Sequence, residues 1–410
     1  MSVDDLQIPA QQLSSFVRKF LPNQSWKKIT ISTLPFDTGS SSYCIDDGES
    51  NVRVIVELNQ SQKQNDVEGA SSSKQEENNN EDGSIASLSN INNNQVEDAI
   101  ISFILSNKGW GPKLLGVGYE GKILDYFEGE CLTPDLASDA NTIRDIAVGY
   151  ARFHSIGSQV PFARDKMSGV KKFLLQESSQ PHNFVKVSRI LSETLRDLDE
   201  NFVKELNKFK LEDEVKWLLQ TYREIPVKSA FIRFQNSFEH VLIRERSASS
   251  STSASATTSF SANPLKKSNT QRRKEVIFSN HSQAMFGPRG IDLGGHFINR
   301  MINWAHKESK INEEVFPPVD ERGLFAREYL DELQSLDPNT FNLDGMDNEG
   351  QILMEADLGA LLYALYSFTQ ILSNESSWQT DPAIVTLLPF FHEFYTRYKL
   401  FCKKKYTHWP

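Results

Sequence analysis

Cysteine is scarce in this 410-residue chain, which holds only Cys44, Cys131 and Cys402. No two of them form a C-x-x-C pair, so their spacing supports neither a structural zinc site nor a thiol redox motif. An odd number of widely separated cysteines also argues against a disulfide framework and is typical of a reducing compartment. We therefore expect a cytoplasmic protein without a cysteine-based metal centre.

Basic charge and long apolar runs are also lacking. Lys and Arg total 44 against 54 Asp and Glu, which gives a formal net charge of −10. Because nucleic-acid binding needs a surplus of cations to neutralise phosphates, we expect no nucleic-acid partner. The longest nearly apolar stretch, residues 358–372, is shorter than the ~20 residues of a membrane-spanning helix. It predicts a buried helix and no membrane span.

The apolar fraction is low, at 39%, although the chain contains 26 Phe, 11 Tyr and 6 Trp. The low apolar fraction and the many aromatic residues are compatible if polar residues are concentrated in segments outside a folded core. Residues 61–94 are almost entirely Ser, Asn, Gln, Glu and Asp, and residues 247–274 are rich in Ser and Thr and end in a basic cluster. Neither segment can bury enough apolar surface to offset the entropy of ordering, so both are predicted to be disordered insertions.

Hydrophobic patterning predicts a small sheet followed by a larger helical part. Residues 52–58 form a β-branched run, residues 96–105 have helical spacing, and residues 114–119 and 122–127 predict a hairpin. Further helices are predicted near residues 142–154, 186–208, 211–223, 295–307, 323–335, 355–372 and 384–404, with a second hairpin of residues 241–243 and 276–278. We therefore predict an α+β chain with an N-terminal segment (1–25), an N-lobe (26–127) and a helical C-lobe (128–410).

Five short motifs carry a resemblance to a known family. Residues 289–297, RGIDLGGHF, resemble the segment R-G-F-D-I-G-N-H-F of choline/ethanolamine kinases. Four further segments resemble family motifs and follow one another in the same order as in the family. They are residues 109–116 (GWGPKLLG), 125–129 (DYFEG), 146–154 and 363–370. The chain is thus identified as a divergent member of the choline/ethanolamine kinase family.

This resemblance implies a two-lobed, protein-kinase-like fold with a small antiparallel-sheet N-lobe and a large helical C-lobe. It implies ATP and Mg²⁺ as cofactors and choline or ethanolamine as the small-molecule substrate. It also implies a role in supplying phospholipid precursors and assembly as a homo- or hetero-dimer. Transfer of a phosphoryl group requires a phosphate-holding turn, a cation on the phosphates, metal ligands and a carboxylate that orients the attacking hydroxyl.

The residues at the family's catalytic positions are substituted. In the family pattern H-N-D-x-Q-x-x-N, Gln235 takes the place of the hydroxyl-orienting Asp and His240 that of the metal-binding Asn. Asn280 takes the place of the metal-binding Asp after the next strand. A Gln side chain cannot accept the proton, Mg²⁺ prefers oxygen ligands to imidazole, and a neutral amide supplies no charge. We therefore expect the binding of ATP and Mg²⁺ to be impaired.

The family's nucleotide positions are only partly kept. The matching residues are Gly39, Ser40, Ser41 and Ser42 in the phosphate loop, Glu57 at a phosphate-binding Arg, Asp125 and Phe127 at the hinge, and Ser237 in the catalytic loop. The first four can equally form a Ser-rich hairpin turn. A carboxylate at residue 57 would repel phosphates. The acid that would partner the lost Arg, Asp98 or Glu97, is then left without its cation.

The family's substrate positions keep aromatic side chains. Tyr363 and Tyr366 match two positions of the aromatic box that holds a quaternary ammonium by cation–π contacts, and they share one helix face. Asn299 takes the place of an acidic residue. The alternative is that these aromatic residues pack in a helical core. Asp292 and Arg289 are kept, and the resemblance gives Asp292 a structural role in bracing the catalytic loop.

Three hypotheses follow from these substitutions. The first is a catalytically impaired family member, a pseudokinase of phosphatidylcholine and phosphatidylethanolamine precursor metabolism. The second is an active ATP-dependent kinase of choline or ethanolamine with rearranged ligands. The third is a non-catalytic dimer partner or scaffold for an active kinase. Whether the chain is an enzyme is left open by its sequence.

Overall fold

The computed structural model describes residues 10–24, 29–33, 41–48, 52–58, 96–118, 121–162, 166–180, 184–194, 200–234, 236–245, 274–304 and 310–410. The two predicted insertions lie outside these residues, except for Lys274, which begins a strand (β9). The chain divides into two compact units, residues 1–128 with 280–283, and residues 129–279 with 284–410.

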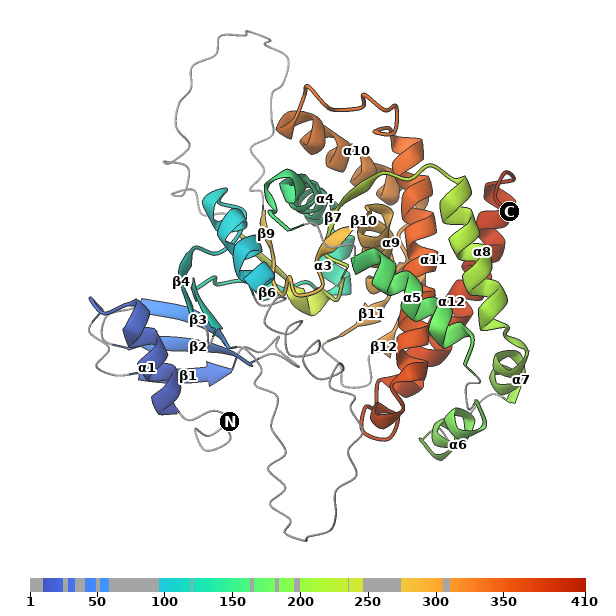
Figure 1. The fold of residues 1–410 in the computed structure, drawn as a ribbon, viewed down its shortest axis with the longest axis horizontal. Coiled ribbons are helices and arrows are strands. Elements are labelled where there is room, and N and C mark those ends of the chain that lie inside the picture. Colours follow the sequence, from blue (N-terminus) through green and yellow to red (C-terminus); the bar gives the residue numbers. More distant parts are fainter. Residues whose placement is uncertain are drawn as a thin grey trace, which may run out of the picture. The chain divides into compact units, whose positions relative to one another are not determined.

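The smaller unit contains a five-stranded antiparallel sheet of order β1-β2-β3-β5-β4 (Figure 1). Its elements are α1 (Ala10–Phe20), β1 (Ile29–Thr33), β2 (Ser41–Asp47), β3 (Val52–Leu58), a helix of residues 96–107, β4 (Leu114–Gly118) and β5 (Gly121–Asp125). Leu13, Phe16 and Val17 of α1 are buried with Val54 and Val56 of β3 in one core cluster. The strand predicted at residues 52–58 and the β4–β5 hairpin are confirmed.

The larger unit is mostly helical and contains short sheets. Its strands are β6 (Glu130–Cys131), β7 (Ser229–Ile232), β8 (Val241–Glu245), β9 (Lys274–Phe278), β10 (Met285–Pro288), β11 (Ile302–Asn303) and β12 (Lys310–Ile311). They form the sheets β6-β8-β9, β7-β10 and β11-β12. The predicted pairing of residues 241–243 with residues 276–278 is confirmed by the antiparallel β8–β9 ladder.

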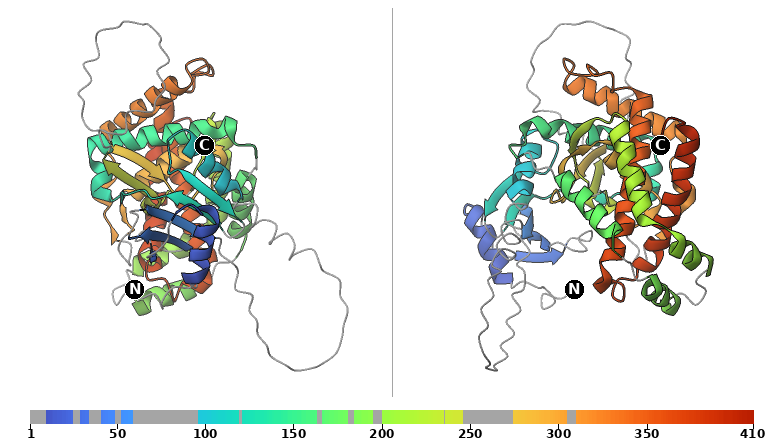
Figure 2. Two further views of the ribbon diagram at one scale, coloured as in Figure 1. Left: turned by 90° about the vertical axis from the view of Figure 1, so that its left-hand side faces the viewer. Right: turned by 45° about the vertical axis from the view of Figure 1, so that its right-hand side comes forward.

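Most helices of the larger unit contribute buried residues to one apolar cluster. They are α3 (Pro134–Ser138), α4 (Ala140–Ser155), α5 (Lys166–Ser178), α6 (Phe184–Thr194), α7 (Glu200–Lys208), α8 (Leu211–Glu224), α9 (Gly290–Asn299), α10 (Val319–Leu336), α11 (Glu349–Ser373) and α12 (Ile384–Lys405). Short 3-10 turns are η2 (Ile156–Gln159), η3 (Phe238–His240), η5 (Glu313–Val315) and η6 (Glu375–Ser377). Figure 2 shows α11 running beside α12 in this unit.

Helix α11 is the one helix among the described residues that is long and apolar enough to cross a membrane by composition. Within its most apolar window 72% of the residues are buried inside the fold, as in the core helix of a soluble protein. This agrees with the buried helix predicted from residues 358–372.

Two glycine positions bring α9 and α11 into backbone contact. A Cβ atom at Gly290 would lie 1.9 Å from the Glu355 carbonyl oxygen, and one at Gly294 would lie 2.2 Å from that of Ala356. Only glycine permits this approach, because any side chain would force the helices apart. The bounds predicted for this helix, residues 295–307, are wrong, because α9 begins at Gly290 and ends at Asn299.

Candidate functional site

The predicted site residues form two groups, one in each compact unit. In the larger unit the catalytic-loop segment runs from the end of β7 to η3. Gln235, at its centre, lies outside the described residues, so its predicted position is not tested. The residues on either side of it, Phe234 and Asn236, are both buried.

Asp292 of α9 binds the start of this loop. Its Oδ2 accepts a hydrogen bond of 2.7 Å from the Arg233 N–H, and its Oδ1 accepts one of 2.8 Å from the Phe234 N–H. Nε2 of His154 lies 3.1 Å from Oδ2. Phe234 has a φ of 64°, a left-handed conformation that is strained for a bulky residue. The Asp292 carboxylate thus braces a strained turn, which is the structural role that the resemblance implies.

Arg233 joins both ends of the loop through its side chain. The fully buried guanidinium donates hydrogen bonds to the backbone oxygens of His240 (3.1 Å) and Ser279 (3.3 Å). It also lies 4.2 Å from the centroid of the Phe278 ring. Burial lowers the pKa of Arg233 from its ordinary value, although Tyr150 and Asp292 oppose that shift. The arrangement fixes the loop by contacts inside the protein.

The remaining residues of this segment are His240, Asn236 and Ser237, and they offer little of what a metal site needs. His240 closes η3, and no group of three or more His, Cys, Asp and Glu side chains within the described ranges could hold a metal ion. Asn236 is occupied, since its amide oxygen accepts a hydrogen bond from the Tyr150 hydroxyl (3.2 Å) and its amide nitrogen donates to Ile291 O (3.4 Å). Ser237 Oγ is buried without a hydrogen-bond partner in the part of the chain described.

In the smaller unit a cation lies where the sequence predicted none. Lys122 of β5 pairs with Glu57 of β3 in the sheet register, and its Nζ lies 2.9 Å from Glu57 Oε2. The same ammonium forms an ion pair with Asp98 of the helix 96–107 and donates a hydrogen bond of 2.9 Å to Ser102 Oγ. The prediction that Asp98 lacks a cation is therefore wrong. Lys122 reaches it from the neighbouring strand.

The charges of this cluster stabilise one another. Burial disfavours the Lys122 charge, but the carboxylates of Asp98 and Glu57 outweigh that effect and raise the pKa of Lys122 above its ordinary value. Burial alone would raise the pKa of Asp98, but Lys122 and His281 outweigh it and lower that pKa. Both groups therefore carry their charges near neutral pH, in a partly desolvated ion-pair cluster.

Asn280 begins a short segment that belongs to the smaller unit. It has a left-handed φ of 55°, which Asn tolerates better than most residues. Its amide oxygen accepts hydrogen bonds from Ser282 Oγ (2.7 Å) and from the Ser282 N–H (3.4 Å). Asp98 Oδ1 accepts a hydrogen bond of 3.0 Å from the His281 N–H. The helix carboxylate is thus attached to the backbone of the predicted metal-binding segment.

The other predicted nucleotide residues are scattered through the same unit. Gly39 and Ser40 lie outside the described residues, and Ser41 begins β2. Ser42 is buried, opposite Glu57 in the β2–β3 register. The Asp125 side chain is exposed and accepts a hydrogen bond from the Tyr126 N–H, whereas Phe127 is buried.

The predicted substrate residues meet in the larger unit. The Asn299 amide nitrogen donates to Gly295 O (2.8 Å) and to the Tyr363 hydroxyl (3.1 Å), and its oxygen accepts from Trp304 Nε1 (2.7 Å). Burial raises the pKa of Tyr363, so its hydroxyl is neutral. The sequence interpretation missed Trp304, five residues after Asn299, because no motif marks it.

Tyr366, one helical turn after Tyr363, faces other aromatic rings. Its ring centroid lies 4.9 Å from that of Phe234 and 5.6 Å from that of Phe173, both in edge-to-face geometry. Tyr366 therefore packs partly as a core residue, which favours the alternative interpretation at this position. The two predicted box residues do not form a box by themselves.

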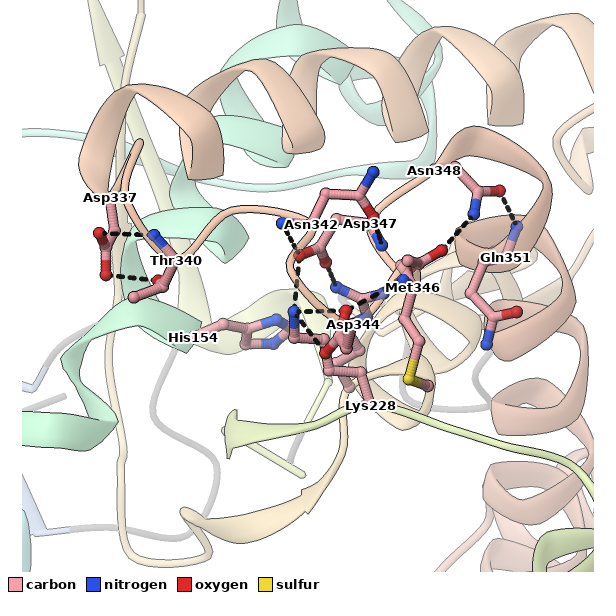
Figure 3. A network of polar contacts seen from close by, with 12 residues as sticks. His154, Lys228, Asp337, Thr340, Asn342, Asp344, Met346, Asp347, Asn348 and Gln351 are labelled. Atoms are coloured by element: carbon pink, nitrogen blue, oxygen red, sulfur yellow. Dashed lines mark hydrogen bonds and ion pairs between the residues drawn. The ribbon is translucent and has the colours of Figure 1, made fainter.

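Arg289 belongs to a buried ionic network at the start of α9. Its guanidinium binds the carboxylates of Glu355 and Asp347 and donates a hydrogen bond of 2.7 Å to Met346 O. Lys228 joins the network through Asp347 (2.6 Å) and Asp344 (3.1 Å), as Figure 3 shows. Burial disfavours the charge, but its hydrogen-bonded and charged partners raise the pKa of Arg289. Arg289 thus ties the loop before α11 to α9.

A cavity of about 460 Å³ lies elsewhere in the larger unit. Its lining includes Met167, Val170 and Leu174 of α5, Tyr222 of α8 and Phe286 of β10. None of the described residues predicted for the site lines this cavity. It is therefore separate from the kinase-type positions.

The residues present do not fit the family's cofactors. Asn280 offers one uncharged oxygen, which already accepts a hydrogen bond from Ser282 Oγ, and Mg²⁺ bound to a polyphosphate needs oxygen ligands that supply charge. The Lys122 ammonium, which lies opposite Glu57 in the sheet, is already bound by two carboxylates and a hydroxyl. The described residues therefore give no support for bound Mg²⁺–ATP.

Comparison with solved structures defines the class of fold. The chain resembles choline kinase from Cryptosporidium parvum, with a TM-score of 0.62, 11% sequence identity and coverage of 96% of each chain. It also resembles Plasmodium vivax ethanolamine kinase, with a TM-score of 0.54, 10% identity and coverage of 96% of this chain and 91% of the other. The predicted α+β, two-lobed, protein-kinase-like fold is confirmed.

Sequence comparison then defines the family. The family model of choline/ethanolamine kinases matches residues 86–379, so this chain belongs to the choline/ethanolamine kinase family. The rat choline/ethanolamine kinase is 23% identical over 245 residues, covering 58% of this chain and 52% of the relative. The human relative is 23% identical over 244 residues, covering 58% and 51%. These alignments thus span only about half the length of the curated relatives.

Proposed function

We propose that this chain is a pseudokinase of the choline/ethanolamine kinase family, which takes part in phospholipid precursor metabolism without transferring phosphate. The observation that carries the proposal is Asn280. At the family's metal-binding position it has a left-handed backbone and offers an amide oxygen that already accepts a hydrogen bond from Ser282 Oγ at 2.7 Å. A charge-bearing ligand for Mg²⁺ is thereby replaced by a neutral, occupied one.

The substitutions at Gln235 and His240 support the same conclusion. An amide at residue 235 cannot accept the proton of an attacking hydroxyl, and loss of a positioned base costs roughly 10²–10⁴ in rate. An imidazole at residue 240 is a poor Mg²⁺ ligand. The bracing of the loop by Asp292 explains how the fold persists without these groups, because its contacts go to backbone N–H groups.

A second candidate is an active kinase of choline or ethanolamine with rearranged ligands. Lys122 favours it, because a cation is present one strand away from the family's position. Asp98 favours it as well, since its carboxylate is hydrogen-bonded to the backbone of His281, the residue after Asn280. We rank it second because Glu57 is a second carboxylate on Lys122, at 2.9 Å, and Asn280 supplies no charge for Mg²⁺.

The test is a transfer assay on the full chain with ATP, Mg²⁺ or Mn²⁺, and choline or ethanolamine, read by mass spectrometry of the phosphorylated amino alcohol. We expect the wild type and Asn280→Ala to match the protein-free control. A quadruple variant, E57R/Q235D/H240N/N280D, restores the family's residues at all four substituted positions and is expected to form product. Product formation by the wild type that Asn280→Ala abolishes would instead establish the rearranged kinase.

The proposal also covers the partners of this chain and its location in the cell. A non-catalytic family member has binding as its remaining activity, so we propose that the chain acts as a homo- or hetero-dimer partner or scaffold of an active kinase in the cytoplasm. Mixing the chain with an active choline/ethanolamine kinase and measuring the mass of the complex by light scattering tests this role. Two separate species would contradict the hetero-dimer and scaffold roles, and a monomeric mass for this chain alone would contradict the homo-dimer.

A further inference from the structure

The Lys122 ammonium has its hydrogen-bonding capacity filled by the protein itself. A lysine carries three N–H donors. Lys122 has three acceptors within one compact unit, namely Glu57 Oε2, Asp98 Oδ2 and Ser102 Oγ. No donor is left for an anion from outside the chain.

Glu57 is the outermost member of this cluster. Its side chain is 23% exposed, compared with 6% for Lys122. It is also directly opposite Lys122 in the β3–β5 register, so the sheet itself holds the two groups together. Asp98, by contrast, is attached to the helix 96–107 and to the backbone of His281. Of the two carboxylates, Glu57 is therefore the one that an incoming anion would have to replace.

The net charge of the cluster opposes such an anion. One ammonium and two carboxylates sum to −1, and a polyphosphate brought next to them would be repelled. A carboxylate and a phosphate present the same chemistry to an ammonium, because each offers oxygens that accept charge-assisted hydrogen bonds. Glu57 can therefore satisfy the contact that a phosphate would make.

We propose that the Glu57 carboxylate occupies the place of a nucleotide phosphate on Lys122, so that the Lys122–Asp98 ion pair forms without nucleotide and polyphosphate is excluded. This inference deepens the proposed function and rests on it for the identity of the ligand class, a nucleoside triphosphate. It makes Lys122 a latent phosphate-binding residue. Removal of Glu57 frees one N–H donor and brings the cluster from −1 to neutral.

The experiment compares the full-length wild type with Glu57→Ala by isothermal titration with ATP and with inorganic tripolyphosphate. A new charge-assisted hydrogen bond corresponds to binding about ten- to a hundredfold tighter than that of the wild type. We expect this gain for both ligands in Glu57→Ala. Glu57→Gln removes the charge but keeps an acceptor, so a smaller gain is expected from this second, more conservative variant.

Two controls isolate Lys122. The double variant E57A/K122M is expected to lose the gain, because its cation is absent. Asp46→Ala removes another carboxylate of the same sheet, which pairs with the half-exposed Arg53, and is expected to bind no better than the wild type. Thermal unfolding of each variant verifies that it is folded. A gain that survives E57A/K122M, or that Asp46→Ala reproduces, would overturn the proposal.

The outcomes separate this inference from the proposed function. Tight ATP binding by the wild type without product formation overturns the inference and leaves the pseudokinase proposal standing. The wild type can instead form product while binding ATP weakly, with Glu57→Ala binding ATP more tightly. That result overturns the pseudokinase proposal and leaves the inference standing.

Discussion

The Asp292 carboxylate and the Phe234 backbone are joined by a hydrogen bond of 2.8 Å, at a residue whose φ is 64°. A bulky residue in this conformation costs about 1–3 kcal/mol and persists only where its surroundings hold it. The second oxygen of the same carboxylate holds the Arg233 N–H. The backbone conformation at the end of β7 therefore depends on the buried Asp292 side chain.

We predict that Asp292→Ala destabilises the larger unit by roughly 3–5 kcal/mol, because it leaves two buried N–H donors and His154 without a charged acceptor. Asp292→Asn should lose less, since an amide oxygen still accepts one of the two bonds. Urea unfolding followed by tryptophan fluorescence measures both. The matched control is Asp337→Ala, whose exposed carboxylate binds Thr340. Equal losses in D292A and D337A would contradict the bracing role.

A second prediction concerns acid stability. Burial, with the charges of Arg300 and Arg233, lowers the pKa of His296 from 6.5 to about 3. Between these values the unfolded chain binds a proton that the folded chain does not. Stability is therefore fully present above about pH 6.5 and falls by about 1.4 kcal/mol per pH unit as the pH drops toward 3.

The replacement His296→Phe isolates this contribution, because it keeps an aromatic ring among Phe238 and Phe325. Urea midpoints at pH 7, 6, 5 and 4 should fall less steeply for this variant than for the wild type. Parallel curves for the two proteins would show that His296 titrates alike in the folded and unfolded chains, against the prediction.

The regular elements were predictable where a local pattern determines them. The helices predicted at residues 211–223 and 384–404 match α8 and α12 closely, because apolar residues recur at helical spacing over the whole length. The helix predicted at residues 186–208 is instead described as two, α6 and α7. The bounds of α9 were missed because glycines at residues 290, 294 and 295 disfavour a helix locally. Close packing against the α11 backbone requires the first two, and the nearby Asn236 side chain leaves no room for a Cβ at the third.

The charged cluster of the smaller unit was not predictable in the same way. The sequence interpretation placed the three members of the cluster, Glu57, Asp98 and Lys122, on two strands and a helix. Their meeting depends on the β3–β5 register and on the placement of a helix far away in sequence. A motif search inspects one position at a time, and so it finds a missing Arg at residue 57 without seeing the lysine opposite.

A third prediction follows from this cluster. Lys122→Met leaves the carboxylates of Glu57 and Asp98 partly buried without their cation, which should cost roughly 3–5 kcal/mol of stability. The depressed pKa of Asp98 adds a pH signature. The ionised Asp98 contributes stability above pH 3.8, its ordinary pKa, and this stability is lost as the pH falls through the lower pKa of the folded chain. Because K122M lacks the cation that lowers this pKa, its stability should fall less at low pH than that of the wild type.

The matched control for Lys122→Met is Arg53→Met on the same sheet. The Arg53–Asp46 pair is largely exposed, and exposed pairs contribute little. Urea unfolding of both variants, in which no denaturant ion screens the charges, should therefore separate them clearly. Equal midpoints for K122M and R53M would show that the Lys122 cluster is no more than a surface ion pair.

The fourth prediction concerns Arg289, whose guanidinium binds Glu355 and Asp347 at once. Arg289→Met leaves the buried Glu355 carboxylate without its cation and Asp347 with Lys228 alone, which should cost roughly 3–5 kcal/mol. Arg289→Lys keeps the charge but cannot reproduce the planar fork, so it should recover only part of the loss. The loop of residues 337–348 should open in both variants, because Asp347 holds it through the Asn342 N–H at 3.0 Å.

Hydrogen exchange measures this opening residue by residue. The amides of Asn342 and Asp347, which are bound within the loop, should lose protection in R289M while those of α12 keep it. The control is Arg327→Met, since its pair with Glu349 is exposed on both sides. Loss of protection in α12 as well would mean that Arg289 stabilises the whole unit. Unchanged exchange at Asn342 would mean that Lys228, which also binds Asp347, holds the loop by itself.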